Sequence, residues 1–216
     1  YDFLITKTSS SVGINNFTVD KSIAKKFNLK LIDPAIEQSQ KIENLKKYFK
    51  SVSIVKDAIS DGNKKIFNIL KAKAGSSFLE PNMENIINWR GYDDRFEIVN
   101  KKEIQTVTLS DFINRNKIEC IDYLRLMVQG QGYDILKDLD KNNFRKINLI
   151  SMTVEFIQIY RNQGIFSDII KLLSTNGFKI VNFEKNTTER ISNPKKRIIN
   201  KLIWSDILFI KDFTKH

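Results

Sequence analysis

The chain has 216 residues, of which 41% are hydrophobic and 11% aromatic, which is enough to bury a core and excludes a wholly disordered chain. Its 36 Lys and Arg residues against 25 Asp and Glu residues give a net charge of +11, which indicates either a solvated lysine-rich surface or attraction to an anionic partner. A single cysteine, Cys120, excludes an intrachain disulfide, and a single histidine, His216, excludes Ser–His–Asp and Cys–His centres and leaves no zinc site to expect.

The first half of the chain alternates short apolar strands with amphipathic helices. Strands are predicted at 1–7, 29–32, 52–55 and 65–70. Helices are predicted at 15–27 and 35–49, where apolar residues recur at helical spacing and Pro34 suits the first turn of the second helix. The polar segment 71–95 is predicted to cross the surface as a long excursion without regular structure.

The second half is predicted to be richer in strands. Ser110 is expected to cap a helix that ends at Asn114, and Cys120 is expected to be a small core thiol beside a buried strand. The other expected elements are extended pieces at 96–99 and 106–109, strands at 121–128, 147–156, 178–183 and 202–210, helices at 133–139 and 166–176, and a polar loop at 184–197.

This alternation of strand and helix predicts an α/β fold with a mostly parallel central sheet and helices on both faces. The last strands are joined without a long helix, so they are expected to form an antiparallel C-terminal edge. We expect residues 1–216 to form a single domain, and the carboxyl ends of the parallel strands to hold the ligand.

Short motifs follow these strands in a fixed order. They are Ile32-Asp33-Pro34, Ala58-Ile59-Ser60-Asp61, Ser76-Ser77-Phe78-Leu79-Glu80-Pro81, Val107-Thr108-Leu109-Ser110-Asp111, Ile121 to Gly130, Val154-Glu155 and Gly177-Phe178. This order resembles the FkbM family of S-adenosylmethionine-dependent methyltransferases over nearly the whole chain. The resemblance implies a Rossmann-like class I methyltransferase fold.

The resemblance also implies a set of site residues. Those implied to bind S-adenosylmethionine are Ser9, Ser11, Gly13, Asp33, Asp57 and Ala58. Among them, Asp33 would bind the ribose hydroxyls, and Asp57 with Ala58 would hold the adenine. The simpler alternatives are that Asp33 caps the next helix, that Asp57 is a solvated turn residue and that the serine run is an ordinary loop.

Candidates for taking a proton from an acceptor are Asp134 and Glu155, although Asp134 also fits a solvated helix face. Four residues depart from the family pattern at the strand ends. Lys7 and Met127 stand where the family has acidic residues, Gln129 stands for a glutamate, and Ser9 stands for a glycine. These exchanges remove carboxylates and place a positive charge where a methionine ammonium would sit.

The resemblance implies O-methylation of a sugar or other small hydroxylated acceptor. The four exchanges favour an alternative, which is a catalytically inactive binding or scaffold domain of the same fold. A nucleic-acid-binding domain is a third hypothesis and depends on the net charge alone. The basic residues are spread along the chain, which disfavours it. No apolar run approaches the ~20 residues of a membrane span, and we expect a cytoplasmic location.

Overall fold

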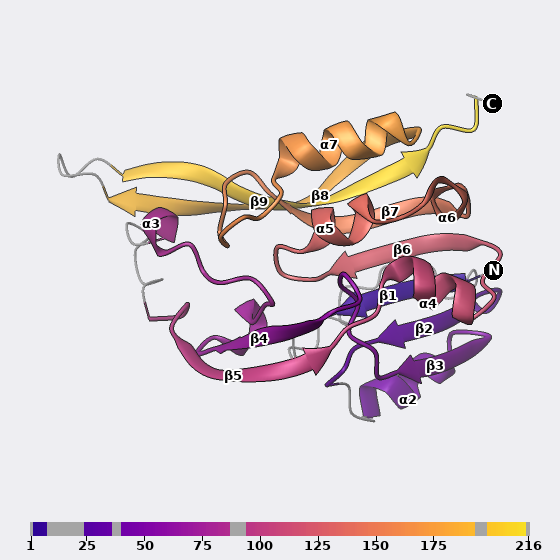
Figure 1. Cartoon of the computed structure of the whole chain (residues 1–216). Coiled ribbons are helices and arrows are strands. Elements are labelled where there is room, and N and C mark those ends of the chain that lie inside the picture. The colour runs from indigo at the N-terminus through magenta and orange to yellow at the C-terminus, as the bar shows by residue number, and fades with distance from the viewer. Residues whose placement is uncertain (1, 8–23, 36–39, 87–93, 193–197, 215–216) are drawn as a thin grey trace.

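A seven-stranded sheet with strand order β3-β2-β1-β6-β7-β9-β8 forms the centre of the computed structural model (Figure 1). The structure describes residues 2–7, 24–35, 40–86, 94–192 and 198–214. The strands of this sheet are β1 (Asp2–Lys7), β2 (Asn28–Ile32), β3 (Ser51–Val55), β6 (Ile121–Met127), β7 (Ile147–Glu155), β8 (Phe178–Ser192) and β9 (Ile198–Lys211).

The first five strands of the sheet are parallel, as predicted, and the last two form an antiparallel edge. β1 pairs with β2 on one side and with β6 on the other, and β9 runs antiparallel to both β7 and β8. The chain therefore winds outward from β1 to β3 and then restarts at β6. The point between β1 and β6 is the topological switch point at which doubly wound sheets bind ligands.

Helices cover both faces of the sheet, because successive strand residues point to opposite sides. On β1, Leu4 joins the core with α4 (Leu109–Arg115), α5 (Gly132–Lys137) and α7 (Phe166–Thr175), whereas Ile5 joins the core with α2 (Gln40–Lys46). Figure 1 shows α4, α5 and α7 on the same side of the sheet. Within the described ranges, no helix is long and apolar enough to cross a membrane.

A second, two-stranded sheet lies beside the central one. Its strands are β4 (Lys64–Leu70) and β5 (Ile98–Gln105). The sequence predicted two short extended pieces at 96–99 and 106–109, so it missed most of β5, which lies between them. The predicted surface excursion is also wrong over its described part. That part contains a 3₁₀ turn at Lys73–Gly75 and α3 (Met83–Ile86), and it buries Ile86 and Phe78.

The predicted polar loop at 184–197 is wrong for its described residues, because β8 continues to Ser192 and pairs with β9 throughout. Hairpin pairing with the apolar strand that follows overrides the weak strand propensity of this polar sequence. The register between the two strands shifts at three places, Ile180/Asn182, Phe183/Lys185 and Thr187/Thr188. Figure 1 shows the two strands extending past the rest of the sheet as a long hairpin.

Three smaller predictions also need correction. Thr108, not Ser110, caps α4, because the Thr108 hydroxyl accepts from the Asp111 backbone N–H at 3.0 Å. Cys120 lies before β6 and is only half-buried, with the Asn148 side chain 3.5 Å from its sulfur. A short helix, α6 (Lys141–Arg145), was not predicted.

Candidate functional site

The carboxyl ends of the parallel strands meet at one edge of the sheet, and the motif residues follow these ends. Lys7 ends β1 and lies in register with Met127 at the end of β6. The residues that continue from β2, β3 and β6 include Asp33, Asp57 and Gln129. Topology therefore brings the candidate site residues from distant parts of the sequence to a common edge.

Asp33 is a buried carboxylate at the end of β2, with 6% of its surface exposed. Its backbone N–H donates to Val55 O at 3.1 Å, and its Oδ1 accepts from the Ala35 backbone N–H at 2.8 Å. The second bond closes a turn at Asp33. The alternative that Asp33 caps the next helix stays a prediction, because α2 begins at Gln40 and residues 36–39 lie outside the described residues. The bond also fixes the carboxylate at the strand end, which is the position that the resemblance implies for the ribose-binding residue.

Asp57 and Ala58 follow β3 and are held by α4 and by the segment that precedes it. The Asp57 carboxylate forms an ion pair and hydrogen bond with the Arg115 guanidinium at the end of α4. Ala58 is buried, and its carbonyl accepts from the Val107 backbone N–H at 2.9 Å. An adenine at this place would meet a carboxylate that already has a cationic partner.

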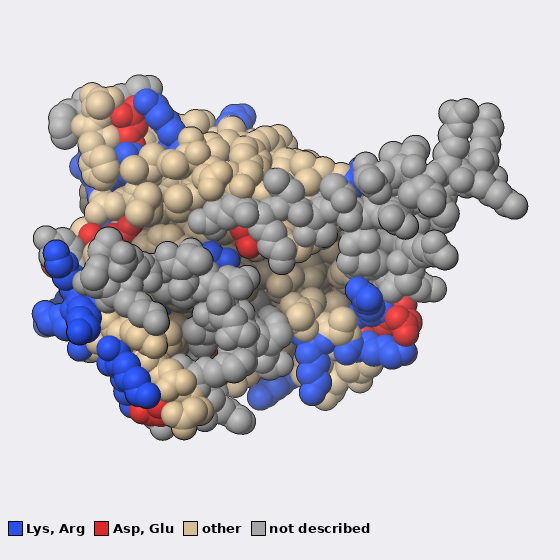
Figure 2. Space-filling view, turned by 180° about the vertical axis from the view of Figure 1, so that it is seen from behind, with Lys and Arg blue, Asp and Glu red and all other residues tan. Residues whose placement is uncertain are grey.

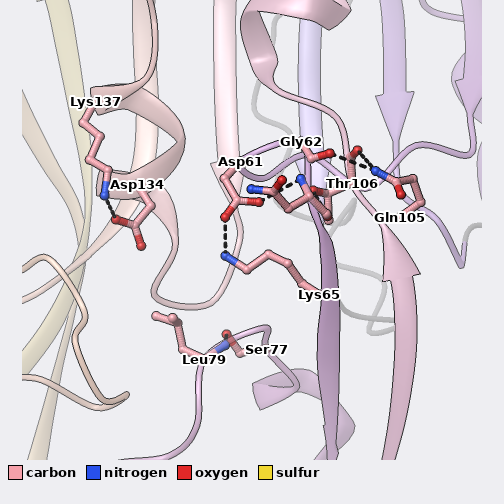
Figure 3. A network of polar contacts seen from close by, with 10 residues as sticks. Asp61, Gly62, Lys65, Ser77, Leu79, Gln105, Thr106, Asp134 and Lys137 are labelled. Atoms are coloured by element: carbon pink, nitrogen blue, oxygen red, sulfur yellow. Dashed lines mark hydrogen bonds and ion pairs between the residues drawn. The ribbon is translucent and has the colours of Figure 1, made fainter.

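Asp61, the last residue of the same motif, fixes the start of β4 (Figure 3). Its carboxylate accepts from the Asn63 backbone N–H at 3.1 Å and pairs with Lys65 at 3.0 Å. Burial would raise the pKa of Asp61, but the hydrogen bonds from Asn63 and Lys65 outweigh it and hold the pKa below its ordinary value. Asp61 therefore orders the connection between β3 and β4.

The serine pair of the family motif has a structural task. Ser76 and Ser77 are both buried, and the Ser76 hydroxyl accepts from the Leu70 backbone N–H at 3.0 Å. The Ser77 hydroxyl accepts from the Leu79 N–H at 3.1 Å and donates to the Gln129 carbonyl at 2.7 Å. Ser77 thus ties the β4 side of the molecule to the turn after β6.

That turn, 129–132, is tightly packed against the loop after β7. Gln129 has φ +40° and Gly130 has φ +84°, both in the left-handed region. A Cβ on Gly130 would lie 2.7 Å from the Tyr160 ring and 3.2 Å from the Gln163 amide nitrogen. Glycine is therefore required at 130 both by the backbone and by the contact.

We expect Gly130→Ala to destabilise the protein by about 1–3 kcal/mol more than Gly177→Ala, measured by urea unfolding. Gly177 is a matched control, because its φ is +81° and no atom lies within 4 Å of its added Cβ. Both variants carry the backbone strain, so the difference reports the contact with Tyr160. Equal destabilisation of the two variants would contradict this expectation, because it would show that the turn accommodates the added Cβ with no loss of stability.

Glu155 ends β7 and has 4% of its surface exposed. Burial raises the pKa of Glu155 to about 8; hydrogen bonding lowers it in part, and the Asp206 charge adds to the rise. The carboxyl is therefore protonated at neutral pH. It lies near Gln163, whose Oε1 accepts from the Ile159 and Tyr160 backbone N–H groups at 2.9 and 3.0 Å.

Asp134 lies in the first turn of α5 and is half-buried. Its carboxylate pairs with Lys137 on the same helix at 2.6 Å (Figure 3), and hydrogen bonding to Asp134 raises the pKa of Lys137. Of the two candidate carboxylates, Asp134 is the one that solvent reaches, and Glu155 is enclosed. Ser9, Ser11 and Gly13 lie outside the described residues.

Three buried side chains at the same edge carry polar atoms without a hydrogen-bond partner in the described part of the chain. They are Thr6 Oγ1 near the end of β1, Ser60 Oγ after β3, and both amide atoms of Gln131 after β6. Buried polar groups are nearly always paired, so unpaired groups near the carboxyl ends of β1, β3 and β6 fit a polar ligand that supplies the partners. The sequence prediction missed them, because a buried Thr, Ser or Gln has no distinctive spacing.

The strand order, the antiparallel last strand and the buried acidic residue after β2 define a class I, Rossmann-like methyltransferase fold. The chain belongs to the FkbM methyltransferase family, because the family model described as "Methyltransferase FkbM domain" matches residues 7–180. Members of this family are S-adenosylmethionine-dependent. No curated protein matches the chain.

Solved structures resemble the chain only remotely, so the fold assignment depends on the topology and the family. The precorrin-6y C5,15-methyltransferase of Geobacter metallireducens is 8% identical, with TM-score 0.40, over 97% of this chain and 80% of that one. The magnesium protoporphyrin IX methyltransferase of Synechocystis, with bound S-adenosylmethionine, is 10% identical, with TM-score 0.37, over 98% of this chain and 71% of that one.

Proposed function

We propose that this chain binds S-adenosylmethionine and transfers its methyl group to an oxygen of a sugar or other small hydroxylated acceptor. Membership of the FkbM family supports the reaction class. The observation that supports cofactor binding in this chain is the set of unpaired, buried polar atoms on Thr6, Ser60 and Gln131, near the carboxyl ends of β1, β3 and β6. The cofactor supplies an activated methyl group, and the chain's residues bind and orient the cofactor and the acceptor.

Asp33 is the residue proposed to hold the ribose hydroxyls, because a carboxylate can accept from both. Asp57 and Ala58 are proposed to hold the adenine edge, and Ser9, Ser11 and Gly13 are proposed to bind the cofactor from the segment that follows β1. Asp57 would act as part of its pair with Arg115. Asp134 and Glu155 are proposed to take part in proton transfer, with Asp134 on the accessible side.

The distribution of charge supports a small acceptor over a nucleic acid. Figure 2 shows most of the visible Lys and Arg in separate groups near the margins of this face, with acidic residues among them. Several lysines are already in ion pairs, including Lys64 with Glu103 and Lys71 with Asp94. A nucleic-acid groove needs a continuous basic strip that tracks the phosphates.

Calorimetric titration of the chain with S-adenosylmethionine and S-adenosylhomocysteine tests the proposal. We expect micromolar binding of both, because the polar edge of the sheet is preserved even though Met127 and Gln129 replace carboxylates. Absence of binding of either compound at millimolar concentration would refute cofactor binding. It would then favour the scaffold interpretation.

A further inference from the structure

Gln129 occupies a strained position directly after the central strand β6. It is a non-glycine residue with φ +40°, and its carbonyl is held by the Ser77 hydroxyl from a segment 52 residues away. Residues in sparsely populated backbone regions persist where their surroundings fix them, and they concentrate at functional sites. The side chain is half-buried, so it has both a protein contact and an open side.

The protein contact of this side chain is Tyr160, which is 2% exposed. The Tyr160 hydroxyl lies 2.7 Å from Gly75 O and 3.4 Å from Gln129 Oε1. A phenol has one proton, and a backbone carbonyl can only accept, so the shorter contact takes that proton. Burial raises the pKa of Tyr160 further above its ordinary value, so the hydroxyl keeps its proton.

The Tyr160 oxygen can then only accept from Gln129. The two ends of a glutamine amide have the same shape, so a half-turn of the amide brings its NH₂ group to Tyr160 and turns its oxygen to the open side. We propose that Gln129 binds an acceptor hydroxyl through this amide oxygen and that Tyr160 is the residue that positions it. This role depends on the proposed function and specifies its acceptor.

The chemistry of the amide oxygen selects the kind of acceptor. It accepts a hydrogen bond but is too weak a base to take a proton, so it orients a hydroxyl without ionising it. A carboxylate has no proton to donate to it and would face an unpaired oxygen. Gln129 therefore favours a hydroxylated, sugar-like ligand over a carboxylate.

The test follows the side-chain amide signal of Gln129 by NMR, with methyl glucoside and acetate as probes. Without ligand, Tyr160→Phe is expected to shift this signal, because it removes the oxygen to which the amide donates. With the chain saturated by S-adenosylhomocysteine, methyl glucoside is expected to shift the signal and acetate to leave it in place. The affinity of the chain for methyl glucoside should fall about fivefold in Tyr160→Phe.

Gln129→Met keeps the length of the side chain and leaves Tyr160 in place, and it should weaken glucoside binding at least as much. Gln105→Met is the control, because Gln105 is an exposed glutamine whose amide donates to Gly62 O (Figure 3). An unmoved Gln129 signal in Tyr160→Phe, or on addition of glucoside, would overturn the inference. Failure to bind S-adenosylhomocysteine would instead refute the proposed function, because the Tyr160 effect is measured without ligand.

Discussion

Asp33→Ala is expected to weaken S-adenosylmethionine binding by about 100-fold or more while the protein stays folded, as measured by calorimetry and circular dichroism. The carboxylate is buried at the end of β2 and is the one acidic group of the motif series placed where a ribose would lie. Its removal leaves two ribose hydroxyls without a charged acceptor. It also removes the cap on the Ala35 N–H, which should cost about 1 kcal/mol of stability.

Asp33→Asn separates these two effects. The amide oxygen can still accept from the Ala35 N–H, so the turn should persist, whereas one of the two acceptors offered to the ribose becomes a donor. We expect a loss of affinity of about tenfold with nearly native stability. Native affinity in both variants would show that Asp33 only closes its turn with Ala35 and that the ribose binds elsewhere.

The second large effect concerns the pH dependence of stability, for which Glu155 should be responsible. The pKa of Glu155 is about 8 in the folded protein and about 4.5 in the unfolded chain. Between these values the folded state holds a proton that the unfolded state releases. The stabilisation is therefore complete below pH 4.5 and is lost as the pH rises through 8, with a slope of about 1.4 kcal/mol per pH unit in between.

Glu155→Gln replaces the protonated carboxyl with a neutral group of similar shape and should remove this slope. The variant is expected to be more stable than the wild type at pH 8, by on the order of 4 kcal/mol, and nearly equal at pH 4.5. Thermal unfolding across this range measures the effect. Glu119→Gln is the control, because Glu119 is exposed. Parallel curves for wild type and Glu155→Gln would contradict burial of a neutral carboxyl.

The central sheet could be predicted because its strands are short segments with closely spaced apolar residues that the core buries. β1, β6 and β7 are of this kind, and α7 has a clear apolar stripe ended by Gly177. The polar half of β8 has no such signal, because its own residues are polar and it is held by pairing with the apolar strand that follows it. β5 was missed because most of its residues are exposed.

The position of a candidate residue was predictable where a motif places it at a strand end, as with Asp33 after β2. It was not predictable where a side chain acts through a partner brought in by folding. Ser77 contacts Gln129, and Tyr160 contacts both Gly75 and Gln129, across separations of 31 to 85 residues. The pairing of Asp57 with Arg115 is of the same kind. Such contacts depend on three-dimensional packing and leave no local pattern.

The irregular pairing of β8 also bears on how the protein behaves at high concentration. β8 is the outer strand of the sheet, and Val181 and Phe183 expose 54% and 41% of their surfaces. A straight strand with such residues would be a template for aggregation. Two of the three register shifts put an extra residue into β8, at positions 181 and 184, and the third puts one into β9, at position 203. Such bulges bend a strand and break the regular row of backbone groups. The hairpin that lengthens the sheet thus also protects the sheet edge from edge-to-edge aggregation.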